Sequence, residues 1–506
     1  MANSKNRYLM LVAAFALLLG ACDKKTTTSS SAFSSSSSSM SESSSLSSSS
    51  NSSSSSMTHQ VTIDELDFRA LGEEGYAVSA KDYTAIEGDL IIPSTYNGKP
   101  VTSIDYGGFH YARKLKSVHI PSSVKLIQGC AFESCERLET MTIEEGLEVI
   151  ESHVFYRCES LQSIVIPDSV NKLSGEAFWR CFSLKSVKLS KNITQIGDYM
   201  FEGCYHLETV NIPDGVTYIG EFAFCDCAIK EITIPNTVKT IKHSAFNDCD
   251  YLKTIHLPTN LEELDASAFI NCDQLETITV ANDNQYFTSI DGVLFSKDQK
   301  TILKYPSAWS KEFNIPSSVT TIGAYAFSSC NNLKAIAIPH TVITIEEDAF
   351  SYDKNLESIT IPDSVTSIGQ YAFCMCYKLQ SFVFPNSISE ISDGFFTYCE
   401  LLQTVSIPET ITYIGSSAFN RCLSLHNVVI PRSVTKFGVW TFDSCSYLDA
   451  IFYKGSETEW NAIENSNNSG LYEHDVTTLY FYSEAAPQTI GNYWHYVGET
   501  PTAWSK

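Results

Sequence analysis

Apolar positions recur along this chain with a fixed period of 23 residues. One unit that starts at Leu356 reads Leu-x-x-Ile-x-Ile-Pro, then Val-x-x-Ile, then Ala-Phe-x-x-Cys, and the next unit starts at Leu379. Copies of this unit extend from about residue 87 to residue 451. Self-similarity at such a period indicates a solenoid, because one unit cannot bury its apolar face alone and stacked units share one core.

Each unit predicts one short strand and a return segment. Leu-x-x-Ile-x-Ile alternates with period two, as a strand does, and the following proline ends it because proline cannot donate to a sheet. Val-x-x-Ile predicts a corner, and Ala-Phe-x-x-Cys predicts a compact return. We expect the phenylalanines to form a structural ladder along the core. Its members are Phe132, Phe155, Phe178, Phe201, Phe224, Phe327, Phe350, Phe373, Phe396, Phe419 and Phe442.

This unit resembles the BspA-type leucine-rich repeat family, and the resemblance covers about 365 of the 506 residues. It implies a curved solenoid of parallel strands carried by bacterial cell-surface proteins. It implies no reaction.

The N-terminal residues have the features of a lipoprotein export signal. Residues 1–21 contain two basic side chains and then an apolar run that is too short to span a bilayer. Leu19-Gly20-Ala21-Cys22 is similar to a lipobox, which predicts that Cys22 is lipidated; simple cleavage after Ala21 is the alternative. Residues 22–58 are mostly serine and threonine and are predicted to be a disordered tether, because such a composition cannot build a core. The lipid anchor is the only membrane contact that we expect.

Three segments depart from the repeat. Residues 59–86 are predicted to cap the N-terminal end of the solenoid, since terminal repeats must close an exposed core. Residues 282–313 interrupt the array, and Asp291-Gly292 predicts a hairpin within a small projecting meander that either splices two blocks of repeats or binds a ligand. Residues 452–506 are rich in aromatic side chains and predict a small β module that either caps the last turn or binds glycan or protein.

Sixteen cysteines are present, and twelve of them occupy the same position of the repeat. Export favours disulfides, and the spacing between stacked turns does not exclude them. A residue that recurs once per turn is more simply explained as a small buried hydrophobe, so a ladder of thiols is the preferred interpretation. The ladder positions are Cys135, Cys158, Cys181, Cys204, Cys227, Cys249, Cys272, Cys330, Cys376, Cys399, Cys422 and Cys445.

The sequence contains no recognisable catalytic, metal-binding or cofactor-binding motif. The eleven histidines are scattered, and zinc-type Cys-x-x-Cys pairs in closed sets of four are absent. We therefore predict no catalytic residue, no metal site, no cofactor and no enzymatic activity. The net charge of −24 without a basic stripe argues against nucleic acid as a partner.

Two surfaces are candidates for ligand binding. Tyr156-Arg157 and Trp179-Arg180 occupy equivalent places in adjacent turns, so stacking would bring two aromatic rings beside two arginines, the residue types enriched in interface hot spots. Packing of the rings against the return segment is the alternative. The second candidate is the solvent face of the strands, where sheet propensity alone could also explain the composition. The candidates on that face are His119, Lys188, Asn211 and His256.

These observations predict a surface-exposed lipoprotein whose solenoid binds a protein ligand. The resemblance suggests adhesion to host extracellular proteins or to other cells. An envelope scaffold that binds other bacterial proteins is the alternative. A glycan-binding or glycan-hydrolysing function is the third reading, although no carboxylate pair in the C-terminal module supports hydrolysis.

Overall fold

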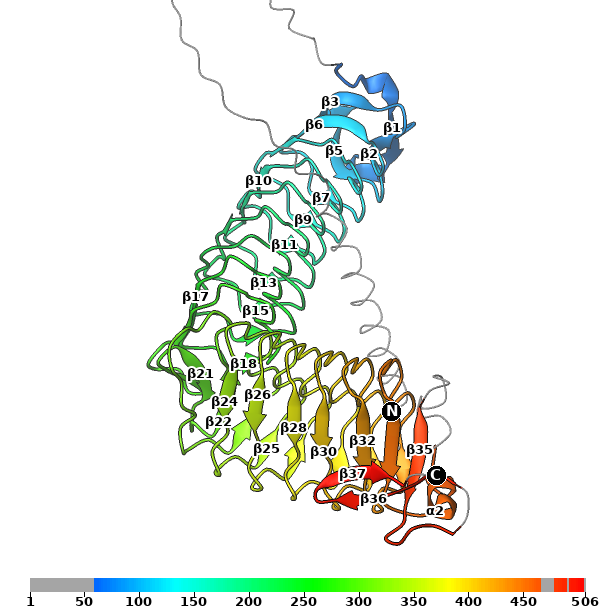
Figure 1. Cartoon of the computed structure of the whole chain (residues 1–506). Helices are drawn as coiled ribbons and strands as arrows, with labels where there is room; N and C mark the ends of the chain where they lie inside the picture. Colours follow the sequence, from blue (N-terminus) through cyan, green and yellow to red (C-terminus); the bar gives the residue numbers. More distant parts are fainter. Residues whose placement is uncertain (1–58, 466–476, 489–490, 505–506) are drawn as a thin grey trace, which may run out of the picture. The chain divides into compact units, whose positions relative to one another are not determined.

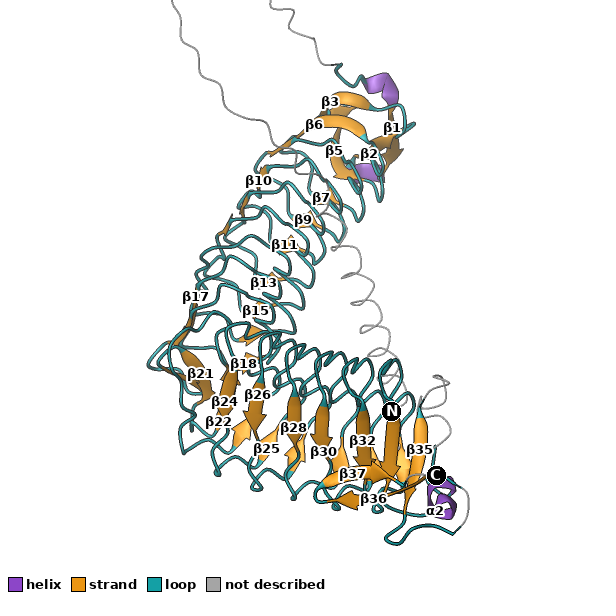
Figure 2. Ribbon diagram, viewed as in Figure 1, coloured by secondary structure: helices purple, strands orange, loops and turns teal. Residues whose placement is uncertain are grey.

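The computed structural model describes residues 59–465, 477–488 and 491–504, which belong to one compact unit, Thr58–Lys506. The predictions for the signal segment, Cys22 and the tether lie outside these residues. Parallel strands stack turn upon turn along the chain (Figures 1 and 2). The prediction of a parallel-stranded repeat solenoid is confirmed. Within the described part of the chain, no helix is both long and apolar enough to cross a bilayer.

The Leu-x-x-Ile-x-Ile segments pair in parallel, in several separate sheets, with a register that follows the repeat. Ser163 faces Ser186, and Ser186 in turn faces Thr209. The first block of repeats contains β3 (Glu87–Ile91), β6 (Lys114–Ile120), β8 (Thr140–Ile143), β10 (Ser163–Val165), β12 (Ser186–Lys188), β14 (Thr209–Val210), β17 (Thr254–Leu257) and β19 (Thr277–Val280). The second block contains β24 (Ala335–Ala337), β26 (Ser358–Thr360), β28 (Ser381–Val383), β30 (Thr404–Ser406), β32 (Asn427–Ile430) and β34 (Ala450–Tyr453).

The Val-x-x-Ile segment, predicted as a corner, forms a second strand. Two-residue strands at this position pair in parallel from turn to turn, so the turn has two hydrogen-bonded sheets instead of one. In the first block they are β5 (Lys99–Ile104, a longer first member), β7 (Leu126–Ile127), β9 (Val149–Ile150), β11 (Lys172–Leu173), β13 (Gln195–Ile196), β15 (Tyr218–Ile219), β16 (Thr240–Ile241) and β18 (Glu263–Leu264). In the second block they are β23 (Thr321–Ile322), β25 (Thr344–Ile345), β27 (Ser367–Ile368), β29 (Glu390–Ile391), β31 (Tyr413–Ile414) and β33 (Lys436–Phe437).

The return segment is held by main-chain hydrogen bonds between turns. The N–H of Phe155 donates to the carbonyl of Ala177 at 2.9 Å, and the N–H of Arg157 donates to the carbonyl of Trp179 at 2.9 Å. Residues two before and two after the phenylalanine adopt the left-handed region, as at His153 and Arg157, both with φ of 58°. This conformation is costly for residues with a Cβ and most costly for β-branched ones. None of the described non-glycine residues with positive φ is Val, Ile or Thr.

The phenylalanine ladder lies at the centre of the core. All eleven predicted members have a relative exposure of 1% or less. Neighbouring rings stack, with centroids 5.1 Å apart for Phe155 and Phe178 and 5.4 Å apart for Phe178 and Phe201. Because each ring contacts the rings above and below it, burial of one turn depends on its neighbours.

Each cysteine of the ladder donates a hydrogen bond to a main-chain carbonyl of the preceding turn. The Cys158 thiol reaches the carbonyl of Phe132 at 3.2 Å, and the Cys181 thiol reaches that of Phe155 at 3.1 Å. All fifteen described cysteines are free thiols. Asp353 takes the ladder position once; it is fully buried and accepts from the N–H of Cys330 at 2.7 Å.

The predicted meander is part of the core and does not project from it. Here β20 (Phe287–Ile290), β21 (Val293–Ser296) and β22 (Thr301–Lys304) are antiparallel, and β22 then pairs in parallel with β23. Leu294 is buried in the apolar core of the first block, whereas Val293 and Phe295 are buried in that of the second. The apolar residues of β21 therefore join two cores, which is why the strand lies inside.

Non-repeat elements stand at both ends of the solenoid. At the N-terminal end, η1 (Ile63–Glu65), β1 (Leu66–Ala70), η2 (Gly72–Glu74), β2 (Tyr76–Ala80) and β4 (Thr95–Tyr96) precede or flank β5. At the other end, α2 (Glu457–Asn461), β35 (Thr478–Tyr482), β36 (Tyr493–Val497) and β37 (Thr500–Ala503) follow β34. Trp460 of α2 is buried against Phe437 and Tyr453 of the core, with centroids 5.6 and 5.2 Å away. This contact supports capping as the role of the module.

Candidate ligand-binding surface

Tyr156 and Trp179 form a stacked pair on the return segments of adjacent turns. Their ring centroids are 4.7 Å apart and their planes are inclined by 27°. The guanidinium of Arg180 lies over the Trp179 ring at 5.3 Å, a cation–π contact. We call Tyr156, Arg157, Trp179 and Arg180 the aromatic–arginine patch. The structure thus brings together the four residues that the sequence placed at equivalent positions.

The backbone fixes the direction of the two arginines. Arg157 and Arg180 each lie two residues after a core phenylalanine, and each has φ of 58°. Their N–H groups donate to the carbonyls of Trp179 and Glu202 at 2.9 and 2.8 Å. Inter-turn hydrogen bonds therefore hold both residues in the left-handed conformation, and the patch rests on a rigid frame.

The aromatic surface extends further than the sequence indicated. Tyr199 lies 6.0 Å from Trp179 and stacks on Phe222 at 5.1 Å, while His153 lies 6.0 Å from Trp179 on the other side. His153, Tyr199 and Phe222 share a repeat position two residues before the phenylalanine, so their 23-residue spacing was the available signal. The prediction from the sequence did not include them, because it covered only the positions that follow the phenylalanine.

The two arginines differ in their electrostatic surroundings. Arg157 donates to Glu159 through Nε at 3.1 Å and through an Nη at 2.9 Å, and this hydrogen bonding raises the pKa of Arg157. Among the described residues, Arg180 has no ion-pair partner. Burial raises the pKa of the nearby Glu202 to about 7, against the opposing charge of Arg180. Arg180 is therefore the arginine of the patch without an ion pair to a described residue, and its charge is opposed in part by Glu202 and Asp226.

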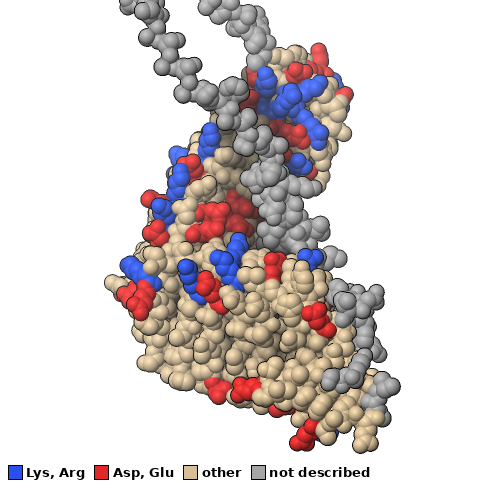
Figure 3. Space-filling view, in the orientation of Figure 1, with Lys and Arg blue, Asp and Glu red and all other residues tan. Residues whose placement is uncertain are grey.

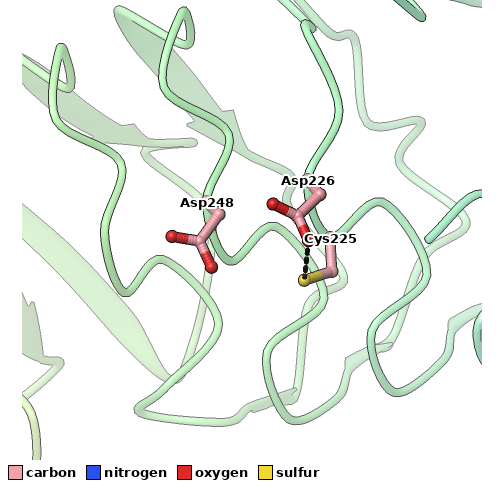
Figure 4. A group of neighbouring side chains, drawn as sticks. All are labelled: Cys225, Asp226 and Asp248. Carbon is pink, nitrogen blue, oxygen red and sulfur yellow. Dashed lines mark hydrogen bonds between the residues drawn. The ribbon is translucent and has the colours of Figure 1, made fainter. Parts of the chain in front are cut away.

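A group of polar side chains continues the same face toward the C-terminus. Cys225, Asp226 and Asp248 lie close together on two adjacent turns, and one ligand atom from each lies within 4.8 Å of the others (Figure 4). Burial is the main cause that raises the pKa of both carboxyls, that of Asp248 to about 7. We call these three residues the thiol–carboxylate cluster. They are the described residues that could hold a metal ion.

The strand-face candidates lie on a separate surface. His119 on β6 and Lys188 on β12 lie in one sheet, Asn211 directly follows β14 of that sheet, and His256 lies on β17 in the separate pair of β17 and β19. Strands such as β12 show the pattern exposed, buried, exposed. His119 and His256 are already engaged, with ring nitrogens 3.1 Å from Glu144 Oε1 and 3.0 Å from Thr279 Oγ1. These four residues are not brought into contact with the aromatic–arginine patch.

Charge is unevenly distributed over the surface. In Figure 3, side chains of both signs lie side by side over the first block, whereas the visible face of the second block carries few charges. A shallow open pocket lies near the N-terminal end, between Arg69, Tyr83, Asp105 and His110. Arg69 is already paired with Asp105 there, and none of the predicted site residues lines it.

The repeats match a known protein family. The model for the BspA type leucine rich repeat region, in six copies, matches residues 102–228, 171–302, 305–402 and 368–481. The chain belongs to the BspA-type leucine-rich repeat family. Comparison with curated proteins gave no match.

Solved structures include similar leucine-rich repeat proteins. A leucine-rich cell surface protein from Faecalibacterium prausnitzii A2-165 is 32% identical, with a TM-score of 0.55, over 80% of this BspA-type chain and 97% of its own. A leucine-rich repeat protein from Bacteroides ovatus ATCC 8483 is 25% identical, with a TM-score of 0.45, over 83% of this chain and 99% of its own. The pneumococcal vaccine antigen PcpA is 20% identical, with a TM-score of 0.40, over 81% and 96%.

Proposed function

We propose that this BspA-type protein is a lipid-anchored protein of the bacterial cell surface that binds a protein ligand through the aromatic–arginine patch. Membership of the family and similarity to a leucine-rich cell surface protein support exposure at the surface. The export signal and Cys22 supply the anchor. The ligand is a host extracellular protein or a protein on the surface of another cell, and the anchored chain is an adhesin rather than an enzyme.

One observation carries the proposal. The stacked pair of Tyr156 and Trp179 lies beside Arg180, which has no ion-pair partner among the described residues. Tyrosine, tryptophan and arginine dominate interface hot spots, because they combine a large apolar area with hydrogen bonding. The inter-turn hydrogen bonds already order the backbone beneath them, so little conformational entropy is lost when a ligand binds.

The geometry favours a protein ligand over a glycan. Carbohydrate recognition by aromatic rings needs an open ring face. Tyr156 is stacked on Trp179, and Tyr199 on Phe222, so each of these rings has one face covered by a neighbouring ring of the same surface. The ring edges and the Arg180 guanidinium suit contact with a protein surface that carries carboxylates.

The test is a binding experiment with matched variants. Tyr156→Ala with Trp179→Ala is compared with the unsubstituted full chain in surface plasmon resonance against host matrix proteins, serum proteins and proteins of the producing cell's own envelope. The matched control is Tyr398→Ala, because Arg421 lies over Tyr398 at 5.0 Å in a cation–π contact of the same kind in the second block.

We expect the double variant to weaken binding about tenfold or more, as loss of a hot spot does, and the Tyr398 variant to leave affinity unchanged. Circular dichroism and melting curves check that both variants fold. Equal affinities in all folded chains would contradict the patch as the binding surface. Binding only to the producing cell's own envelope proteins would replace the adhesin with an envelope scaffold.

A further inference from the structure

The thiol–carboxylate cluster lies on a rigid part of the solenoid. Asp226 and Asp248 occupy the same repeat position in adjacent turns and have φ of 60° and 55°. Their N–H groups donate to the carbonyls of Asn247 and Ile270 at 3.0 and 3.1 Å. The inter-turn bonds therefore fix the spacing of the two carboxylates, and the left-handed backbone directs both toward the same side (Figure 4).

Three different side chains offer ligand atoms at this point. The Cys225 sulfur lies 3.9 Å from Asp226 Oδ2. This sulfur, one carboxylate oxygen of Asp226 and one of Asp248 all lie within 4.8 Å of one another. In a tetrahedral site with metal–sulfur bonds of about 2.3 Å and metal–oxygen bonds of about 2.0–2.2 Å, ligand atoms are roughly 3.3–3.6 Å apart. Side-chain movements on the order of 1 Å would close the cluster around an ion.

Asn247 gives a second, independent indication. Its side chain is only 2% exposed, and its Nδ2 lies 2.8 Å from Asp248 Oδ2 and 3.7 Å from the Cys225 sulfur. Its Oδ1 is buried and has no hydrogen-bond partner in the described structure. A buried carbonyl oxygen without a partner is costly. In the structure Nδ2 donates to Asp248, and this oxygen faces away from the cluster; rotation of the amide on metal binding would replace that hydrogen bond and turn the oxygen toward Cys225 and Asp248.

The negative charges at this place are only partly opposed by the protein: the charge of Arg180 opposes the rise in the pKa of Asp226, whereas the causes that act on the pKa of Asp248 include no cation. Within the described ranges, neither Asp226 nor Asp248 forms an ion pair, and Glu202 of the preceding turn has a buried Oε2 without a hydrogen-bond partner. Like charges at such separation repel strongly where water is partly excluded. A bound cation would relieve this repulsion.

We propose that Cys225, Asp226 and Asp248 bind one Zn²⁺ ion, with Asn247 Oδ1 as the fourth ligand. Binding replaces the thiol proton, which leaves to solvent, so that a Cys225 thiolate and two carboxylates hold the ion. The sulfur ligand favours Zn²⁺ over Ca²⁺ and Mg²⁺, because those ions take oxygen ligands in larger sets. The bound ion links two adjacent turns beside the aromatic–arginine patch.

The chain supplies a matched control for this site. Cys374-Met375-Cys376 has the same Cys-x-Cys spacing as Cys225-Asp226-Cys227, and Cys374 is likewise buried, but Met375 stands in place of the carboxylate. The test compares the full chain with Asp226→Asn plus Asp248→Asn, Cys225→Ser and Cys374→Ser. Asparagine tolerates the left-handed conformation, so the first variant keeps the local backbone.

Equilibrium dialysis against Zn²⁺, followed by metal analysis, measures stoichiometry and affinity, and Co²⁺ substitution reports sulfur ligation through its thiolate charge-transfer absorption. We expect one ion per chain in the unsubstituted protein and in Cys374→Ser. The carboxylate variant should bind at least about tenfold to a hundredfold more weakly, and Cys225→Ser should lack the Co²⁺ absorption. Circular dichroism confirms folding.

Three results would overturn the proposal. They are the absence of stoichiometric Zn²⁺ binding by the unsubstituted chain, undiminished binding in the folded carboxylate variant, and an equal loss in Cys374→Ser. The last two would assign the ion to the other thiols. Ligand binding by the aromatic–arginine patch is measured with different variants, so the two proposals can fail separately.

Discussion

The thiol of Cys158 donates a hydrogen bond to the main-chain carbonyl of Phe132, 26 residues earlier, over 3.2 Å. The same relationship joins the ladder cysteines to the preceding turn along both blocks, as for Cys422 and Phe396 at 3.3 Å. The carbonyl of Phe132 already accepts from the N–H of Cys135 at 3.2 Å, and its second lone pair can take another donor. Cysteine supplies one in a space that is otherwise apolar, which explains why the residue recurs.

The ladder thiols should resist modification in the folded protein. Burial raises the pKa of Cys272 and Cys445 to about 12, and the thiolate is the reactive form. Maleimide titration without reductant should label Cys130, which is only half-buried, before unfolding and the ladder cysteines only after it. Few thiols after denaturation would indicate disulfides and would contradict the ladder.

Replacement of a ladder cysteine should destabilise the fold by removing the donor. We expect Cys158→Ala to lower the free energy of unfolding by about 0.5–1.5 kcal/mol, because the thiol hydrogen bond is lost while the Phe132 carbonyl keeps the N–H of Cys135 as a donor. Cys130→Ala, outside the ladder, is the control and should change stability much less. Urea denaturation followed by circular dichroism measures both; equal effects would count against the hydrogen bond as the cause.

The loss of stability on replacing a phenylalanine with alanine should depend strongly on where that phenylalanine lies. Phe178 is fully buried, so Phe178→Ala should cost about 3–5 kcal/mol. Phe222 is half-buried and stacks on Tyr199 at the surface, so Phe222→Ala should cost only about 1 kcal/mol. Chemical denaturation compares the two variants, and similar losses would mean that Phe178 does not carry the core.

The carboxyl group of Asp348 should make a pH-dependent contribution to the free energy of unfolding. Burial is the largest cause that raises its pKa to about 7, and Glu347 adds repulsion. Because the pKa of Asp348 is higher in the folded chain than in the unfolded chain, protonation of Asp348 favours the folded state. This contribution to the free energy of unfolding is complete below about pH 4 and is lost as pH rises through about 7. Asp348→Asn should therefore stabilise the chain by roughly 1–3 kcal/mol at pH 8 and have little effect at pH 4.

The control for this pH dependence is Asp214→Asn, which changes an exposed carboxylate in a turn. Thermal melts across the pH range compare the two variants with the unsubstituted chain. A stabilisation by Asp348→Asn that is independent of pH would show that titration of Asp348 is not its origin.

The anchor is tested at Cys22, which precedes the described residues. Cys22→Ser should move the protein from the membrane fraction to the soluble or secreted fraction, because no other lipid attachment is predicted. Cell fractionation with immunoblotting measures the distribution, and Cys130→Ser is the control. A variant that stays with the membrane would assign the anchor to another part of the chain.

The sequence by itself determined the repeat, its core and its family. A spacing of 23 residues places Phe155, Phe178 and their equivalents at one height of successive turns, so a single ladder follows from periodicity alone. The same reasoning found Tyr156 with Trp179, because both occupy one repeat position. Such pairs can be predicted since stacking relates only equivalent positions.

Contacts between non-equivalent positions were decided by the tertiary structure. Trp179 contacts Tyr199, which occupies a different repeat position, and Cys225 lies near Asp248 of the next turn. Residues in the left-handed conformation, held by hydrogen bonds between turns, set the directions of these side chains. The second sheet arises because the Val-x-x-Ile backbone must pair once buried. Likewise Leu294 and Phe295 are drawn inward because two apolar cores meet at their strand, which spacing along the chain does not encode.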